Sequence, residues 1–351
     1  MAQMRYLDYL LRDPLLSDEM KEGLDGVEVI ESTNVSNYYF QESSQEYWDL
    51  PDFPALAPPF ENFWLDFRAP SYSMSTERGR NTWSATSPSH WGFLCCGIDF
   101  HKDPISTDRF LATVHTFHRD FFEQVMPQAR WGLDMYLHWR QAEKNMSPLW
   151  YWRMLLDEKG RVIVDPVNKQ NSVSTVALLP DISRYLAMEE ERLCLEEKLT
   201  PQEKHKIKDK MQVIQDDLYN QILPFWHTAL LTISFLHCRN VSLDERPSET
   251  IGVHNKNQKR RGVKPYQTIP YKVLDIYPMK EVLKKEGKSE SIGTPKALHI
   301  CRGHFKDYSH GRGLFGNPRL NGIYWQPQIV KGSSQKGVRV KDYIIHTNTK
   351  T

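Results

Sequence analysis

Two segments rich in tryptophan and tyrosine constrain the fold most strongly, because their apolar and polar residues alternate. The first covers residues 132–140 (GLDMYLHWR) and the second covers residues 149–157 (LWYWRMLLD). A period of two in residues that favour strands predicts β-strands. The second segment ends in a turn sequence, residues 157–160 (DEKG), and RVIVDP follows it. This order predicts a β-hairpin.

Two further strands are predicted nearer the N-terminus. Residues 58–70 (PPFENFWLDFRAP) alternate apolar with polar side chains, with Trp64 as the exception, and residues 91–100 (WGFLCCGIDF) form a continuous apolar run of strand length. Adjacent residues of a strand point to opposite faces, so Cys95 and Cys96 cannot bind one metal ion together. We interpret them as buried structural thiols.

The middle of the chain has helical patterns. Residues 200–203 (TPQE) fit a capping box with proline at the first helical position. The apolar residues that follow recur every three or four positions on one helical face: Ile207, Met211, Ile214, Leu218 and Ile222. These patterns predict an αα-hairpin over residues 183–222, and the apolar run after Pro224 predicts a third, buried helix to about residue 237.

The patterns together predict an α+β fold, with antiparallel sheets around a helical hairpin and one buried helix. We expect an acidic mixed β/α part over residues 1–180, which begins with a helix over residues 4–24. The helical hairpin and the buried helix occupy residues 181–245, and a basic β-rich part occupies residues 246–351. The three parts can belong to one continuous fold.

Several features predict a cytoplasmic chain that does not enter a membrane. No apolar run reaches the roughly 18–20 residues that span a bilayer. The first residues, MAQMRYLDYLLRDP, do not resemble a signal peptide. The chain has five cysteines, an odd number without a CxxC pair, which favours free thiols in a reducing compartment.

Charge is distributed unevenly along the chain, although its net value is +1. Residues 251–351 hold 20 basic and 6 acidic residues, whereas residues 1–250 hold 25 basic and 38 acidic residues. The two halves can neutralise each other within the molecule. Alternatively, the basic half binds a polyanion and the acidic half binds a protein partner.

Reactive side chains gather in residues 298–331, and four of them are candidates for catalysis: Arg302, His304, Tyr308 and His310. Histidine exchanges protons near neutral pH, and arginine can bind phosphate through two parallel hydrogen bonds. Metal-independent cleavage of RNA needs a base, an acid and a cation beside the phosphate. The cluster therefore predicts a ribonuclease site, with His304 as base or acid, Arg302 on the phosphate, and Tyr308 or His310 as the second proton carrier.

The same region also holds candidates for nucleic-acid binding. Cationic side chains beside aromatic rings are typical of proteins that bind single strands. A basic loop over residues 254–265 and the reactive stretch together supply nine such residues: Lys256, Lys259, Arg260, Arg261, Lys264, Lys306, Arg312, Tyr324 and Trp325.

No metal ion or cofactor is predicted. Cys301 and His304 have a spacing that zinc ligands use, and His237 and Cys238 could complete the set, but they lie on different predicted elements. Residues 311–316 match GxGxxG by letter, yet no helix is predicted after them, so a dinucleotide site is not expected.

Several motifs resemble an uncharacterised family of bacterial, plasmid and prophage proteins. They are HxCRGHFKxY at residues 299–308, LFG at 314–316, GxYW at 322–325, SFLHCRNV at 234–241 and PPFENFW at 58–64. The resemblance implies a mobile-element or phage-conflict setting and no particular chemistry. We therefore expect a cytosolic, metal-independent RNA-cleaving or RNA-binding effector of toxin or phage-defence type. The alternative is a non-enzymatic interaction protein that binds or blocks a host or phage factor through its charged surfaces.

Overall fold

The chain divides into two compact units, one of residues 1–236 and 243–274 and one of residues 237–242 and 275–351. The computed structural model describes residues 5–13, 18–24, 26–42, 52–77, 80–102, 126–141, 144–163, 174–178, 222–251, 260–262, 266–276, 297–301, 304–326, 329–331 and 333–338. The division into three parts stays a prediction, because most of its central part lies outside these residues.

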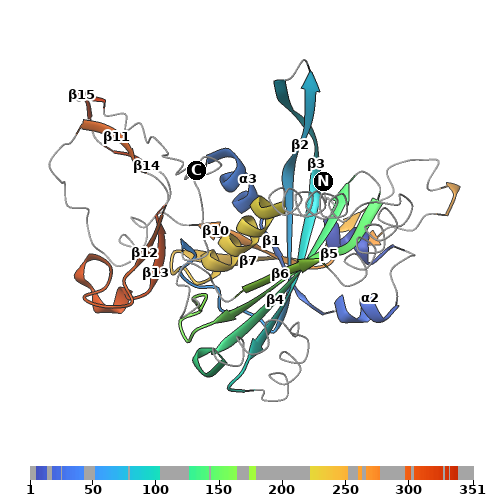
Figure 1. Cartoon of the computed structure of the whole chain (residues 1–351), viewed down its shortest axis with the longest axis horizontal. Helices are drawn as coiled ribbons and strands as arrows, with labels where there is room; N and C mark the ends of the chain where they lie inside the picture. The colour runs from blue at the N-terminus through green and yellow to red at the C-terminus, as the bar shows by residue number, and fades with distance from the viewer. Residues whose placement is uncertain are drawn as a thin grey trace, which may run out of the picture. The chain divides into compact units, whose positions relative to one another are not determined.

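Eight strands form the main sheet, in the order β6-β5-β4-β3-β2-β1-β10-β7 (Figure 1). Their bounds are β1 Glu28–Glu31, β2 Asn62–Glu77, β3 Arg80–Asp99, β4 Trp131–Gln141, β5 Lys144–Leu156, β6 Ser174–Leu178, β7 Val241–Arg246 and β10 Tyr271–Ile276. The strands from β2 to β6 pair antiparallel, whereas β1 pairs parallel with both β2 and β10. The α+β class is confirmed, but the sheet is mixed and not purely antiparallel.

The parallel pairing of β1 with β2 has a simple cause. After β1 the chain forms the helix α3, Thr33–Glu42, and then a proline-rich segment before β2 begins. A connection of this length can return the chain to the end of the sheet where it started, and the next strand then runs in the same direction. β3 follows β2 closely in the sequence and β5 follows β4 closely, and each of these two pairs is antiparallel.

The predicted alternation of side chains is confirmed in β4 and β5. Met135 and Trp152 are opposite each other on one face and are both buried. On the other face, Asp134 is opposite Arg153, whose Nε donates to Asp134 Oδ1 at 2.7 Å. The predicted turn at residues 157–160 also forms: the Asp157 side chain accepts from the backbone N–H groups of Lys159 and Arg161.

The predicted buried helix forms over residues 222–236 and is yellow in Figure 1, where it crosses the sheet. The ring of Trp226 lies 4.7 Å from that of Phe93 on β3 and 5.1 Å from that of Trp152 on β5. The helix therefore covers the apolar face of these strands. The predicted αα-hairpin, with its capping residue Thr200, lies outside the described residues.

The predicted helix over residues 4–24 is observed as two helices, α1 (Tyr6–Leu10) and α2 (Asp18–Leu24). Tyr6, Leu7 and Leu10 are buried against Trp64 and Val29. This packing explains why Trp64 breaks the alternation of β2. It lies on the second face of the sheet, and α1 covers that face.

Asp66 on β2 is buried beneath α1 and makes the packing sensitive to pH. It accepts from the N–H of Leu7 at 3.0 Å and from Trp64 Nε1 at 3.1 Å. Burial raises the pKa of Asp66 from 3.8 to about 6; the hydrogen bonds lower it and the negative charge of Glu31 raises it further.

We expect the stability that Asp66 contributes to be lost as pH rises from 4 to 7. The protonated form is favoured in the folded state, so its contribution is complete below the unfolded pKa of 3.8 and declines through the folded pKa of about 6. The change amounts to roughly 3 kcal/mol. Asp66→Asn stays neutral, so the unfolding free energy of the wild type minus that of the variant should fall by this amount over the same pH range. A difference that does not change with pH would contradict this role of Asp66.

The second unit contains a three-stranded sheet in the order β14-β11-β15 and a separate hairpin of β12 and β13. The bounds are β11 Ala297–Cys301, β12 His304–Asp307, β13 Ile323–Gln326, β14 Ile329–Lys331 and β15 Ser333–Val338. Two short strands, β8 Thr250–Ile251 and β9 Tyr266–Gln267, pair within the first unit, and a 3-10 turn, η3, covers Met126–Gln128.

Candidate nucleic-acid interface

The hairpin of β12 and β13 carries most of the described candidate residues. His304 is opposite Gln326 and Lys306 is opposite Tyr324. Alternate residues of a strand share a face, so His304 and Lys306 lie on the same side of the hairpin. Phe305 lies on the other side, where its ring is 4.8 Å from that of Trp325. Arg302 lies outside the described residues.

The loop between the two strands is compact. It contains two 3-10 turns, η4 (Leu314–Gly316) and η5 (Pro318–Leu320). Leu314, Leu320 and Tyr324 form a small buried cluster, and the Tyr324 hydroxyl donates to the carbonyl of Leu320 at 3.1 Å. Tyr308 is half-buried and packs edge-on against Tyr324, with ring centres 5.9 Å apart.

Two of the glycines in this stretch are needed for the loop geometry. Gly313 has φ of +72°, and a Cβ there would overlap the carbonyl group of Asn317. Gly322 has φ of +133°, and a Cβ there would lie 2.7 Å from Cδ of Arg239. These glycines therefore permit a left-handed backbone and close packing. The turn after Gly313 is the short η4 and not a nucleotide-binding helix.

Residues 238–240 hold the hairpin from a distant part of the sequence. Arg239 donates to the carbonyls of Arg319 at 2.8 Å and Asn321 at 2.7 Å. The Asn240 side chain accepts from the N–H of Trp325 at 2.9 Å and donates to its carbonyl at 2.8 Å. Two of the motifs that carry the resemblance, SFLHCRNV and GxYW, are thus in direct contact.

We expect Asn240→Ala to destabilise the second unit by about 2–4 kcal/mol. The substitution leaves the buried N–H and carbonyl of Trp325 without partners, and each such group costs roughly 1–3 kcal/mol. Asn317→Ala is the matched control, because the hydrogen bond that its side chain accepts from the Arg319 N–H is exposed to solvent. Urea unfolding checks this, and equal midpoints for the two variants would refute the proposed role of Asn240.

The outer surface of the hairpin and its loop is mainly cationic. His304, His310, Arg312 and Arg319 are exposed, and Lys306 is partly exposed. Within residues 304–326, which are all described, Asp307 is the single acidic residue, and its carboxylate accepts from the N–H of Ser309 at 2.8 Å.

Tyr324 and Trp325 have exposed fractions of 0% and 2%, so neither ring is available for the base stacking that the sequence suggested. Leu314 and Leu320 of the loop pack against Tyr324 on one face of the strand, and Phe305 contacts Trp325 on the other face. Neighbouring aromatic residues in a strand can both be buried when both faces of the hairpin are covered.

The predicted basic loop belongs to the first unit. Arg260 and Arg261 are exposed, and Lys256, Lys259 and Lys264 lie outside the described residues. The loop and the hairpin belong to different units, and their joint role in binding stays a prediction.

The spacing of the catalytic candidates favours binding over acid–base chemistry. His304 and Lys306 are roughly 7 Å apart along the strand, close enough to contact one phosphate. His304 and Tyr308 are roughly 13 Å apart by the same measure, and Tyr308 packs against Tyr324. The assignment of these side chains as proton carriers stays a prediction.

The described residues contain no group of three or more His, Cys, Asp or Glu side chains arranged to hold a metal ion. Cys238, which the zinc hypothesis used, is buried, and burial raises the pKa of its thiol. Zinc binds the thiolate form, which this environment disfavours.

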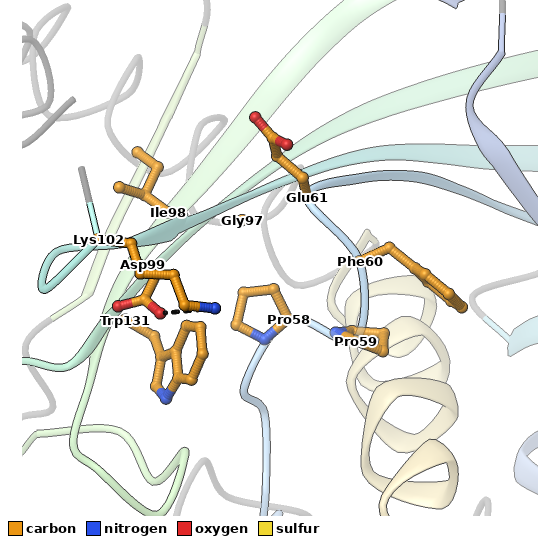
Figure 2. A pocket seen from close by; sticks show the side chains of 9 residues that line it. All are labelled: Pro58, Pro59, Phe60, Glu61, Gly97, Ile98, Asp99, Lys102 and Trp131. Atoms are coloured by element: carbon orange, nitrogen blue, oxygen red, sulfur yellow. Dashed lines mark ion pairs between the residues drawn. The ribbon is translucent and has the colours of Figure 1, made fainter.

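A pocket in the first unit was missed by the sequence analysis (Figure 2). It has a volume of about 400 Å³ and is lined by Pro58, Pro59, Phe60, Glu61, Gly97, Ile98, Asp99, Lys102 and Trp131. The first four residues begin the PPFENFW motif, which is the one sequence signal that coincides with the pocket. The others come from the end of β3, from Lys102 just after it and from the start of β4. Side-chain periodicity does not reveal which strand ends lie beside a loop.

No family model, curated protein or solved structure matches this chain. The family resemblance of the motifs therefore stays a prediction. Within the ranges that the structure describes, no helix has both the length and the apolar character needed to cross a bilayer.

Proposed function

We propose that this chain binds single-stranded RNA through the β12–β13 hairpin and its loop. The observation that carries the proposal is the placement of His304 and Lys306 on one face of β12, continued by exposed His310 and Arg312 in the loop. Cations along a strand can follow the phosphates of an extended nucleic acid. Arg239 and Asn240 hold this surface in a fixed shape, which lowers the entropy lost on binding.

The charge of the second unit supports the same proposal. Its residues 237–242 and 275–351 include 15 basic and 6 acidic side chains. Such an excess attracts polyanions and accelerates their association. Because the hairpin buries its aromatic rings, the affinity comes from phosphate contacts and depends little on base sequence. The setting we propose is that of a cytosolic effector of toxin or phage-defence type.

Cleavage of the bound RNA is the second candidate function, and His304 is the residue that favours it. It is exposed and lies beside Lys306 on the same face, where an imidazole could accept a proton from a 2′-hydroxyl. His304→Ala should then reduce the cleavage rate by about 10²–10⁴ and change RNA affinity little.

The experiment compares wild-type protein with His304→Ala in binding and cleavage of a labelled single-stranded RNA without added metal. Binding without cleavage supports an RNA-binding protein, and cleavage that depends on His304 supports a ribonuclease. Absence of binding to RNA at low salt would refute both and favour a non-enzymatic protein that binds a host or phage factor through its charged surfaces.

A further inference from the structure

The pocket beside β3 in the first unit has preformed walls. A Cβ at Gly97 would overlap the ring of Pro58, so the glycine allows Pro58 to lie directly on the strand. The Gly97 N–H donates to the carbonyl of Glu61 at 2.7 Å. Just before Pro58 in the sequence, the Leu56 N–H donates to the carbonyl of Gly160 at 2.7 Å. These contacts fix a wall of conformationally restricted residues, so ligand binding would order little of it.

One cation of the pocket is available to a ligand. The Asp99 carboxylate already accepts from Arg130 Nη2 at 2.9 Å and from the N–H of His101 at 3.1 Å. The third partner is Lys102, whose Nζ lies 3.6 Å from Asp99 Oδ2. The side chain of Lys102 is 78% exposed. Arg130 alone can neutralise Asp99, so Lys102 can leave this pair for an anionic group at small cost.

The pocket also offers a carboxylate. Glu61 is exposed, and its side chain makes no hydrogen bond or ion pair among the described residues. In Figure 2 its carboxylate points away from Pro58 and Trp131. Because it is exposed, turning it toward a ligand costs little beyond rotamer entropy. An ionised carboxylate has two acceptor oxygens and no donor.

These groups define the ligand that fits. The indole of Trp131 gives a flat apolar surface for a planar ring, and the ring of Pro58 adds an apolar contact. Lys102 provides a cation for a phosphate. The carboxylate of Glu61 provides two adjacent hydrogen-bond acceptors. Among the four RNA bases, guanine presents two adjacent donors, N1–H and the 2-amino group, on its Watson–Crick edge. The pairing edge of adenine or cytosine places an acceptor beside the amino group, and uracil has no amino group.

We propose that this pocket binds a guanine nucleotide, with the base against Trp131 and Pro58, its two donors on Glu61 and its phosphate on Lys102. The proposal goes beyond RNA binding by the hairpin and does not depend on it, because every residue that it uses belongs to the first unit.

Isothermal titration of the full chain with GMP, IMP, guanosine and UMP tests the proposal. IMP differs from GMP by the 2-amino group, so GMP should bind roughly tenfold more tightly, the effect of one charge-assisted hydrogen bond. Guanosine lacks the phosphate and should bind roughly tenfold more weakly than GMP. A short RNA that begins with 5′-phosphorylated guanosine then shows whether an RNA end is accepted as well as a free nucleotide.

Two variants locate the site. Glu61→Gln should abolish the preference for GMP over IMP, and Lys102→Gln should abolish the preference for GMP over guanosine. Glu22→Gln and Lys159→Gln, which change exposed side chains outside the pocket, should leave both preferences intact. Failure of GMP to bind at millimolar concentration, or GMP binding that neither pocket variant weakens, would overturn the proposal. Binding of phenylalanine with the same dependence on Glu61 and Lys102 would overturn it in favour of an amino-acid site.

Discussion

Trp226→Ala is expected to lower the unfolding free energy of the first unit by about 3–5 kcal/mol. The side chain is fully buried and contacts Phe93 and Trp152 on two different strands. Its removal leaves a cavity between the helix over residues 222–236 and the sheet, and the rigid strands cannot close that cavity. Urea unfolding followed by circular dichroism measures the loss.

Trp226→Phe is the matched control for this prediction. The indole N–H of Trp226 is buried and has no hydrogen-bond partner among the described residues, so replacing it with an apolar ring removes a donor that they leave unsatisfied. The substitution by phenylalanine should lower the unfolding free energy of the first unit by less than about 1.5 kcal/mol. Equal unfolding midpoints for the alanine and phenylalanine variants would show that the helix does not depend on this residue to cover the sheet.

Most strands of the first unit could be predicted because they have one buried and one partly polar face. Met135 and Asp134 illustrate this alternation, since the first faces the apolar core and the second pairs with Arg153. β1 was not predicted because it has four residues, and both central ones, Val29 and Ile30, are buried. A strand buried on both faces has no period of two, so the parallel pairing that it brings to the sheet could not be inferred.

The sequence predicted a cluster of candidate residues, but the contacts that these residues make were only partly predictable. The placement of His304 and Lys306 on one face follows from strand geometry alone. The burial of Tyr324 depends on the loop folding back onto the strand, and Asn240 reaches Trp325 from 85 residues earlier. Local patterns contain no information about contacts of that range.

Reversing the charge of Lys306 and Arg312 together is expected to weaken RNA binding roughly a hundredfold. Each charge-assisted contact contributes about 1.5 kcal/mol, and a tenfold change in affinity corresponds to about 1.4 kcal/mol. Lys306→Glu with Arg312→Glu should also make the log–log dependence of affinity on salt shallower by about 1.4, since each phosphate contact on a single strand contributes about 0.7.

The matched control is Lys159→Glu with Arg161→Glu, which changes the net charge equally at exposed positions of the first unit. It should leave both the affinity and the salt dependence close to those of the wild type. A circular dichroism melt of each double variant confirms that the comparison is made between folded proteins.

The most direct test of RNA binding by the hairpin is the affinity of these three proteins for one single-stranded RNA across a salt series. If the hairpin binds RNA, the affinities of the wild type and the control fall steeply with salt, and the hairpin variant binds more weakly with a shallower dependence. Equal affinities for the two double variants, or a wild-type affinity that does not change with salt, would contradict it.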